Sequence, residues 1–194
     1  MALEVIGITG PHGSGKTEVA KALSRFDVPC VRMGDVVWEE VRRRGQEITE
    51  ANVARVASEL REREGLEAIA KRCVPLIKSR GKNKRAVVVD GIRGAAEVNE
   101  FRRAFGQNFH LIAVRAGEQT RYSRIASRGR TDDADTREKF KEKDRREDEW
   151  GLEEAIALAD FTIVNEGTLE ELHRKAVEIY KKLTGEKFET ARRS

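Results

Sequence analysis

Gly10-Pro11-His12-Gly13-Ser14-Gly15-Lys16-Thr17 matches the phosphate-binding pattern G-x-x-x-x-G-K-[ST] without a gap. An apolar run of strand length, residues 4–9, comes before it, and residues 18–23 follow it with helical spacing. Strand, loop and helix in this order are the context that the pattern needs in order to bind phosphate. The stretch therefore predicts a site for the phosphates of a nucleoside triphosphate.

Each residue type in this loop has a chemical reason. The glycines let the backbone curl so that successive N–H groups face inward, and they leave no side chain in the way of a phosphate. The helix that begins near Gly15 points its positive end at the same place. Lys16 adds a charge for the β- and γ-phosphates, and Thr17 offers a hydroxyl to Mg²⁺. The candidate ATP-binding residues of the loop are Gly10, Pro11, His12, Gly13, Ser14, Gly15, Lys16 and Thr17.

Composition narrows the class of protein. The chain has 194 residues and a net charge of +4, from 38 basic and 34 acidic side chains. This length fits one domain with a substantial core, and so small a basic excess does not by itself indicate nucleic-acid binding. No apolar run approaches the length of a membrane span and no signal peptide is recognisable, so we expect a cytoplasmic protein. Cys30 and Cys73 match no metal or redox spacing and are expected to be reduced.

Five apolar segments of strand length alternate with helical segments. The strands are expected over residues 4–9, 28–33, 85–90, 109–114 and 161–165. This alternation predicts an α/β fold, a five-stranded parallel sheet with helices on both faces. Helices are expected over residues 15–25, 36–44, 49–64, 66–78, 95–104, 118–127, 136–149 and 168–183.

The sequence is expected to form one domain over residues 1–184, followed by a loose basic tail, 185–194. Two inserts depart from the simple alternation, residues 34–80 and residues 128–150. Inserts at the carboxyl ends of parallel strands lie over the ligand crevice. We therefore expect the first insert to bind the phosphoryl acceptor and the second to act as a lid.

Asp90 and Arg93 are the next candidates for chemistry. Asp90 follows three valines at the end of a predicted central strand, where phosphate-loop enzymes hold Mg²⁺. The alternative for Asp90 is a cap of the next helix. Arg93 can present two parallel donors to a phosphate, and the alternative for it is a solvated surface position.

A group of arginines precedes and enters the second insert. Arg121, Arg124 and Arg128 share one helix face, and Arg130 follows in a polar loop. Arginines brought in by a closing loop stabilise the charge of a moving phosphoryl group. The alternative for Arg121 is a salt-bridged, solvated face, which is also the default for the densely charged residues 137–149.

These motifs together resemble nucleoside monophosphate kinases. The residues that carry the resemblance are Gly10–Thr17, Gly34-Asp35, Asp90-Gly91-Ile92-Arg93 and Arg128–Asp133, which look like the landmarks of adenylate kinase. Dephospho-coenzyme A kinase is similar in outline. The segment Asn165–Leu172 resembles the turn near the ATP base in both. The likeness extends to an adenylate-kinase-related group of P-loop kinases and covers most of residues 3–183.

The resemblance implies roles for the matching positions. The loop and Lys16 would hold the donor phosphates, Thr17 and Asp90 would serve Mg²⁺, and Arg93 would grip the acceptor phosphate. Further implied positions are Asp35 at the acceptor, Asn165 at the ATP base, and Arg124, Arg128 and Arg130 in the lid.

The chain departs from the adenylate kinase pattern in two places. Adenylate kinases have an acceptor-phosphate arginine shortly after their Gly-Asp pair, where this chain has Trp38. Trp38 could stack on a base or could be a half-buried core aromatic, and Arg42, one helical turn on, could replace the lost charge. The lid is also short, with Arg128 and Asp132 nearly adjacent.

These features give one main expectation and two alternatives. The main one is transfer of the γ-phosphate of ATP, with Mg²⁺, to a nucleoside monophosphate such as AMP or CMP. The second is transfer to a hydroxyl, as in dephospho-coenzyme A kinase, with Asp35 as the base. The third is an ATPase switch that acts on an RNA or protein partner. The catalytic candidates are Lys16, Asp35, Arg93, Arg128 and Arg130.

Overall fold

A computed structural model describes residues 2–128 and 136–185 of the chain. Its centre is a parallel five-stranded sheet with the strand order β2-β3-β1-β4-β5. The strands are β1 (Glu4–Thr9), β2 (Cys30–Arg32), β3 (Ala86–Ile92), β4 (Phe109–Arg115) and β5 (Phe161–Val164). The predicted fold class is therefore confirmed.

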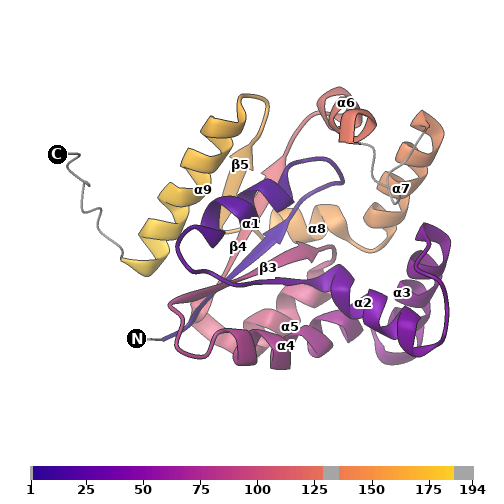
Figure 1. Cartoon of the computed structure of the whole chain (residues 1–194), viewed down its shortest axis with the longest axis horizontal. Helices are drawn as coiled ribbons and strands as arrows, with labels where there is room; N and C mark the ends of the chain where they lie inside the picture. The colour runs from indigo at the N-terminus through magenta and orange to yellow at the C-terminus, as the bar shows by residue number, and fades with distance from the viewer. Residues whose placement is uncertain (1, 129–135, 186–194) are drawn as a thin grey trace.

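The helices cover both faces of this sheet (Figure 1). One face packs against α1 and α9, which also contact each other, and the other face packs against α2, α4 and α5. The helices are α1 (Lys16–Ser24), α2 (Met33–Arg43), α3 (Glu50–Glu64), α4 (Ala68–Arg80), α5 (Ala95–Phe105), α6 (Glu118–Arg128), α7 (Arg137–Glu149), α8 (Leu152–Ala157) and α9 (Leu169–Thr184), with a 3₁₀ turn, η1, at Gly106–Asn108.

Alternation within the central strands divides the core into two clusters. In β1, Val5 belongs to the cluster under α4 and α5, while Ile6 and Ile8 belong to the cluster under α1 and α9. Val88 of β3 lies with Ile6, and all four side chains are 0% exposed. Burial on both faces explains the nearly unbroken apolar sequence of these strands.

The site lies where the chain reverses direction across the sheet. β1 is paired with β3 on one side and β4 on the other, so the loop after β1 opens into the crevice at the carboxyl ends of the strands. β3 continues past Asp90 to Ile92 through a bulge at Gly91, whose φ is +100°. Asp90 is thus inside the strand, whereas the sequence suggested that the strand ends there.

Two features of the helices differ from what the sequence predicts. Gly34 and Asp35 were expected to end the second strand, but α2 begins at Met33 and includes both in its first turn. An acidic residue in a first turn is favoured by the helix dipole, which accounts for this early start. The short helix α8 was not expected; it follows Gly151, whose φ is +87°.

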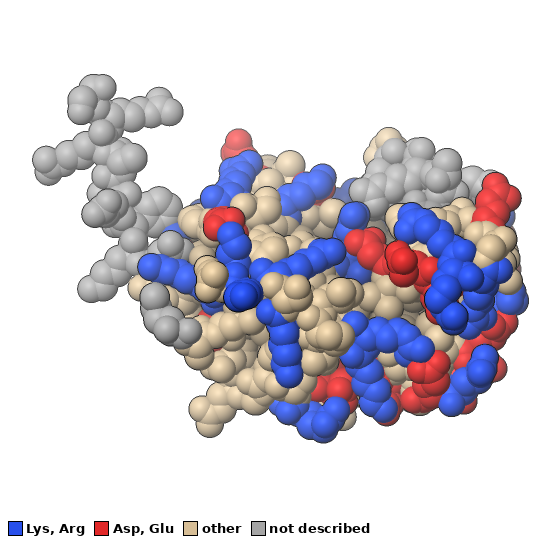
Figure 2. Space-filling view, turned by 60° about the horizontal axis from the view of Figure 1, so that its bottom comes forward, with Lys and Arg blue, Asp and Glu red and all other residues tan. Residues whose placement is uncertain are grey.

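The surface is densely charged with both signs. Figure 2 shows basic and acidic side chains next to one another over much of one face. Many pair within one helix, such as Arg43 with Glu40 at 2.8 Å. Exposed pairs of this kind contribute little stability. Cys30 and Cys73 are free, as expected, and burial raises the pKa of each thiol to about 12.

Within the described residues, no helix has the length and apolar character needed to cross a membrane.

Candidate active site

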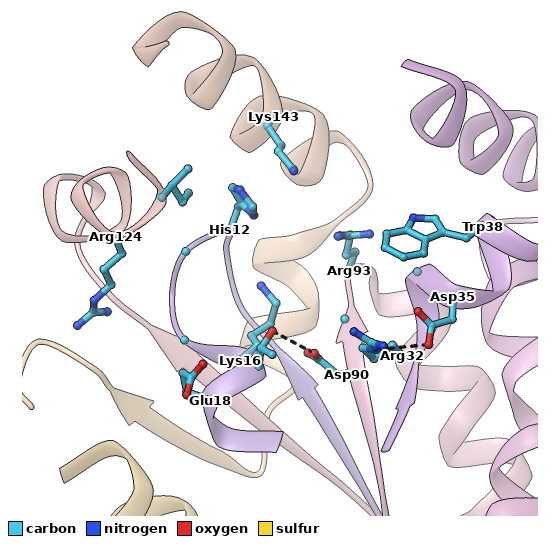
Figure 3. A pocket seen from close by; sticks show the side chains of 16 residues that line it. His12, Lys16, Glu18, Arg32, Asp35, Trp38, Asp90, Arg93, Arg124 and Lys143 are labelled. Atoms are coloured by element: carbon cyan, nitrogen blue, oxygen red, sulfur yellow. Dashed lines mark hydrogen bonds and ion pairs between the residues drawn. The ribbon is translucent and has the colours of Figure 1, made fainter. Parts of the chain in front are cut away.

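A cavity of about 520 Å³ opens at the carboxyl ends of β1, β2 and β3 (Figure 3). It joins the phosphate-binding loop to the start of α2 and the end of β3. The residues that line it are His12, Gly13, Gly15, Lys16, Thr17, Glu18, Arg32, Gly34, Asp35, Trp38, Asp90, Gly91, Arg93, Arg124, Ile125 and Lys143.

The phosphate-binding loop has the backbone shape that its glycines allow. Gly13 and Gly15 have φ values of +79° and +107°. A Cβ on Gly15 would lie 2.5 Å from Nδ2 of Asn165, and that amide donates to the carbonyl of Ser14 at 2.8 Å. Asn165, which directly follows β5, therefore holds the backbone of the loop in place.

Lys16 is folded back onto its own loop. Its Nζ donates to the carbonyl oxygens of Gly10 at 2.5 Å and Pro11 at 2.9 Å. Burial lowers the pKa of this ammonium, against the opposing effect of Glu147 and Asp90. A bound triphosphate would offer Lys16 charged acceptors in place of two neutral carbonyls, and charge-assisted hydrogen bonds are the stronger kind.

Thr17 and Asp90, the two residues expected to hold a cation, lie next to each other. The hydroxyl of Thr17 donates to Oδ2 of Asp90 at 3.5 Å, a weak contact. Asp90 is 8% exposed, and its Oδ1 is buried without a hydrogen-bond partner in the described part of the chain. Burial raises the pKa of Asp90, while Lys16 and Arg93 lower it. An orphaned buried carboxylate oxygen beside a hydroxyl fits Mg²⁺, which prefers hard oxygen ligands.

Arg93 enters the cavity from the end of β3 and is held from two sides. Its backbone N–H donates to Oε2 of Glu97 at 2.8 Å, and its Nε donates to Oε1 of Glu147 at 3.1 Å. Glu147 belongs to α7 and its side chain is only 2% exposed. Arg93 itself is 32% exposed and faces the cavity next to Trp38 (Figure 3).

The end of β2 and the first turns of α2 form the wall of the cavity beside Arg93. Trp38, half-buried, places its ring along the cavity (Figure 3). Arg32 and Asp35 also line it and form an ion pair with an Nε–Oδ2 distance of 3.3 Å. This wall therefore combines an aromatic face with a charged pair.

The chain is similar in sequence to several known proteins. A family model described as an AAA domain matches residues 6–150. A UPF0200/UPF0201 protein of Archaeoglobus fulgidus is 48% identical over 94% of this chain and 57% of that protein. A UPF0200 protein of Methanosarcina barkeri is 41% identical over 91% of this chain and 94% of that protein. The chain belongs to the UPF0200 family.

Solved structures support the fold of this UPF0200 family member. TT1252 from Thermus thermophilus matches with a TM-score of 0.65 and 23% identity, over 95% of this chain and 100% of that chain. A gluconokinase from Sinorhizobium meliloti matches with a TM-score of 0.59 and 16% identity, over 94% of each chain. The expected P-loop kinase fold is thereby confirmed, whereas the specific likeness to adenylate kinase stays a prediction.

The structure places most of the predicted site residues of this UPF0200 family member in one cavity, but not all. Arg124 lines it on the α6 side, opposite Trp38 (Figure 3). Arg42 does not line it; its side chain is 58% exposed and lies 3.9 Å from Glu39. Asn165 contacts the loop backbone and does not line the cavity. Arg130 lies outside the described residues, and so does the side chain of Arg128.

Arg121 connects the phosphate-binding loop to α7. Its guanidinium forms two hydrogen bonds with Asp144, at 2.8 and 2.7 Å, and donates to the carbonyl of His12 at 3.0 Å. The side chain is 9% exposed. Sequence reasoning left Arg121 between a catalytic role and a solvated face; the structure shows a buried, paired side chain.

A second buried group lies beside Arg93. Arg61 of α3 donates to Glu97 at 3.0 Å, and its guanidinium lies 4.3 Å from the ring centre of Trp150. Arg61 and Glu97 are both buried. Since Glu97 also accepts a hydrogen bond from the backbone N–H of Arg93, this group fixes the strand end that carries Arg93. Sequence reasoning missed Arg61, Glu97 and Glu147 because a charged side chain on a helix is usually solvated.

Proposed function

We propose that this protein transfers the γ-phosphate of ATP to a nucleoside monophosphate such as AMP or CMP. One observation carries the proposal. A single cavity contains the phosphate-binding loop at one end and Arg93 with Trp38 at the other, and Asp90 lies between them (Figure 3). A guanidinium beside an aromatic ring suits a ligand that has both a phosphate and a base.

The donor half follows from the loop. Its inward N–H groups and the amino end of α1 would receive the β- and γ-phosphates, with Lys16 moving onto them from the carbonyls of Gly10 and Pro11. Thr17 and Asp90 would hold Mg²⁺. When bound, Mg²⁺ neutralises charge on the β- and γ-oxygens.

The acceptor half follows from β3 and α2. Arg93 would bind the acceptor phosphate, and Trp38 would stack on its base. An acceptor phosphate is already anionic and needs no general base, so Asp35, paired with Arg32, would orient the acceptor. We extend the proposal to the two inserts: residues 34–80 would bind the acceptor, and residues 128–150 would act as the lid.

Transfer to a hydroxyl is the second candidate, because Asp35 lines the same cavity and could serve as a base. The variant Asp35→Asn separates the two reactions. Loss of nearly all of kcat would favour a hydroxyl acceptor, whereas a change mainly in acceptor KM would favour a phosphate acceptor.

The test is a transfer assay with γ-labelled ATP and Mg²⁺. The acceptors are a panel of nucleoside monophosphates and dephospho-coenzyme A. We expect label in a nucleoside diphosphate. Label in the product of dephospho-coenzyme A would instead establish the hydroxyl reaction. Label only in inorganic phosphate, with every acceptor present, would contradict the proposal and favour an ATPase switch.

A further inference from the structure

Glu147 differs from the other charged groups near the cavity because it is buried and belongs to α7, the helix in the second insert. Its side chain is 2% exposed, although α7 is otherwise densely charged and largely solvated. Its contact is made with one atom of Arg93, the Nε, at 3.1 Å. Burial raises the pKa of Glu147, but Arg93 and Lys16 lower it further, so the net direction is down and the carboxylate is charged.

In the described part of the chain, Arg93 donates hydrogen bonds only from its backbone N–H and its Nε. Within residues 2–128 and 136–185, its two Nη groups donate no hydrogen bond, and the side chain is 32% exposed to the cavity. A planar guanidinium held at Nε cannot turn about its axis without breaking that bond. The two parallel Nη donors are the groups that fit a phosphate.

We propose that Glu147 is the positioning residue of Arg93: it holds Nε so that the two Nη groups face an acceptor phosphate. This inference deepens the proposed function and rests on it. It also gives α7 a defined task, because the acceptor arginine is correctly oriented only while α7 is in place.

The position of α7 depends in turn on the donor loop. Asp144 precedes Glu147 by three residues, so both side chains lie on one face of α7. Asp144 binds Arg121, and Arg121 binds the carbonyl of His12 in the phosphate-binding loop at 3.0 Å. A chain of direct contacts therefore runs from the donor loop through α7 to the acceptor arginine.

The kinetic test compares Glu147→Gln with the wild type and with Glu149→Gln. Glu149 is on the same helix, but it is 67% exposed and lies 3.9 Å from Arg145, so it serves as the matched control. We expect Glu147→Gln to raise the KM for the acceptor about tenfold, because a hydrogen bond between charged groups is weakened. The KM for ATP should change by less than about twofold, since the hydrogen bond that the variant weakens is made with Arg93 and not with the phosphate-binding loop.

Two outcomes of this experiment would overturn the inference. An unchanged acceptor KM would mean that Arg93 needs no help from Glu147. A lower acceptor KM would mean that Glu147 competes with the acceptor for Arg93. If Glu147→Gln does not fold, Glu147→Asp takes its place, because its shorter side chain keeps the charge but withdraws the oxygen from Nε, with the same expected rise.

A second measurement does not depend on turnover. The Nε–H signal of Arg93 in a ¹⁵N NMR spectrum can be assigned by its loss in Arg93→Lys. We expect a sharp signal in the nucleotide-free wild type and in Glu149→Gln, and its broadening in Glu147→Gln. An unchanged signal in Glu147→Gln would refute the inference even if the kinase reaction is established. Failure of every acceptor in the transfer assay would refute the proposed function, and the NMR signal would still decide the contact.

Discussion

Asp90, the proposed Mg²⁺ ligand, lowers the stability of the fold when it is ionised. Burial raises its pKa above the value in the unfolded chain, so the native state favours the protonated acid. This contribution to stability is fully present below the unfolded pKa of about 3.9 and is lost as the pH rises through the higher folded pKa. Above the folded pKa the protein carries a buried carboxylate charge that a bound cation would compensate.

We expect Asp90→Asn to raise Tm at pH 8 and to raise it less at pH 4, because it removes a charge that is unfavourable only when ionised. The same variant should lose Mg²⁺-dependent turnover. Thermal unfolding at the two pH values checks this, with the exposed Glu62→Gln as the control. A lower Tm for Asp90→Asn at pH 8 would show that the carboxylate stabilises the apo fold.

Trp38 could contact the acceptor or could be a core aromatic, and its variants distinguish the two roles. We expect Trp38→Ala to raise the KM for the acceptor about tenfold, and Trp38→Phe to raise it less, because stacking on a base contributes about 1–3 kcal/mol. The KM for ATP should stay the same. Steady-state kinetics check this, with Phe161→Ala as the control, since Phe161 is at the start of β5 and does not line the cavity. An equal acceptor KM in all three variants would make Trp38 a packing residue only.

The site residues divide into those that a sequence can reveal and those that it cannot. Lys16 and Thr17 belong to a pattern with fixed spacing, and Asp90 follows an apolar run that marks a strand. Glu97 and Glu147 have no such marker, because the pairs Arg61–Glu97 and Arg93–Glu147 join residues 36 and 54 positions apart in the chain. Arg42 was a candidate by helical spacing from Trp38, but the helix turns it to solvent.

The helix α7 is the element whose buried contacts the sequence did not indicate. Its alternating charges suggested a solvated face. A weaker signal was present: Phe140, Asp144 and Glu147 are spaced by four and three residues, which places them on one face. Phe140 is 0% exposed and lies under Arg121, with 5.0 Å between ring centre and guanidinium. One apolar residue was too little to indicate that Glu147 is buried and that Asp144 is paired.

We expect the pair of Arg121 and Asp144 to attach α7 to the rest of the domain, and variants of the pair test this. We expect Asp144→Asn to lower the free energy of unfolding by about 2–3 kcal/mol, because it leaves a buried guanidinium without its charge partner. The double variant Arg121→Met with Asp144→Leu should recover most of that loss. Urea denaturation checks both.

The neighbouring pair of Arg145 and Glu149 provides the control for this experiment. Both side chains are largely exposed, at 76% and 67%, so Arg145→Met should change stability by less than about 0.5 kcal/mol. If Asp144→Asn were as mild as the control, α7 would be held by other contacts.

For the molecule as a whole, the sequence predicts a sheet between two layers of helices but not the order of the strands in that sheet. Alternating apolar and helical segments were sufficient for a parallel sheet with helices on both faces. The order β2-β3-β1-β4-β5 depends on which faces the crossovers take, and no local pattern records that. The short α8 was missed because its six residues are too few for a periodic signal.

Binding of ATP to the loop should stabilise the entire domain. At an ATP concentration 100 times Kd, with Mg²⁺, we expect a gain of about 2.7 kcal/mol, which corresponds to a rise in Tm of roughly 5–10 °C for a chain of this size. Lys16→Met should lose most of this rise, because Lys16 is the only cation that the loop motif itself supplies. A thermal-shift measurement checks it, and an equal rise in Lys16→Met would argue against phosphate binding at the loop.

We propose that one cavity holds the donor and the acceptor nucleotides end to end. The most direct measurement is inhibition by a bisubstrate analogue, in which adenosine and the nucleoside of the accepted monophosphate are joined by five phosphates. We expect it to compete with both ATP and the monophosphate, since it would span the distance from the phosphate-binding loop to Arg93 and Trp38. Competition with ATP alone, at any concentration of the monophosphate, would contradict this account.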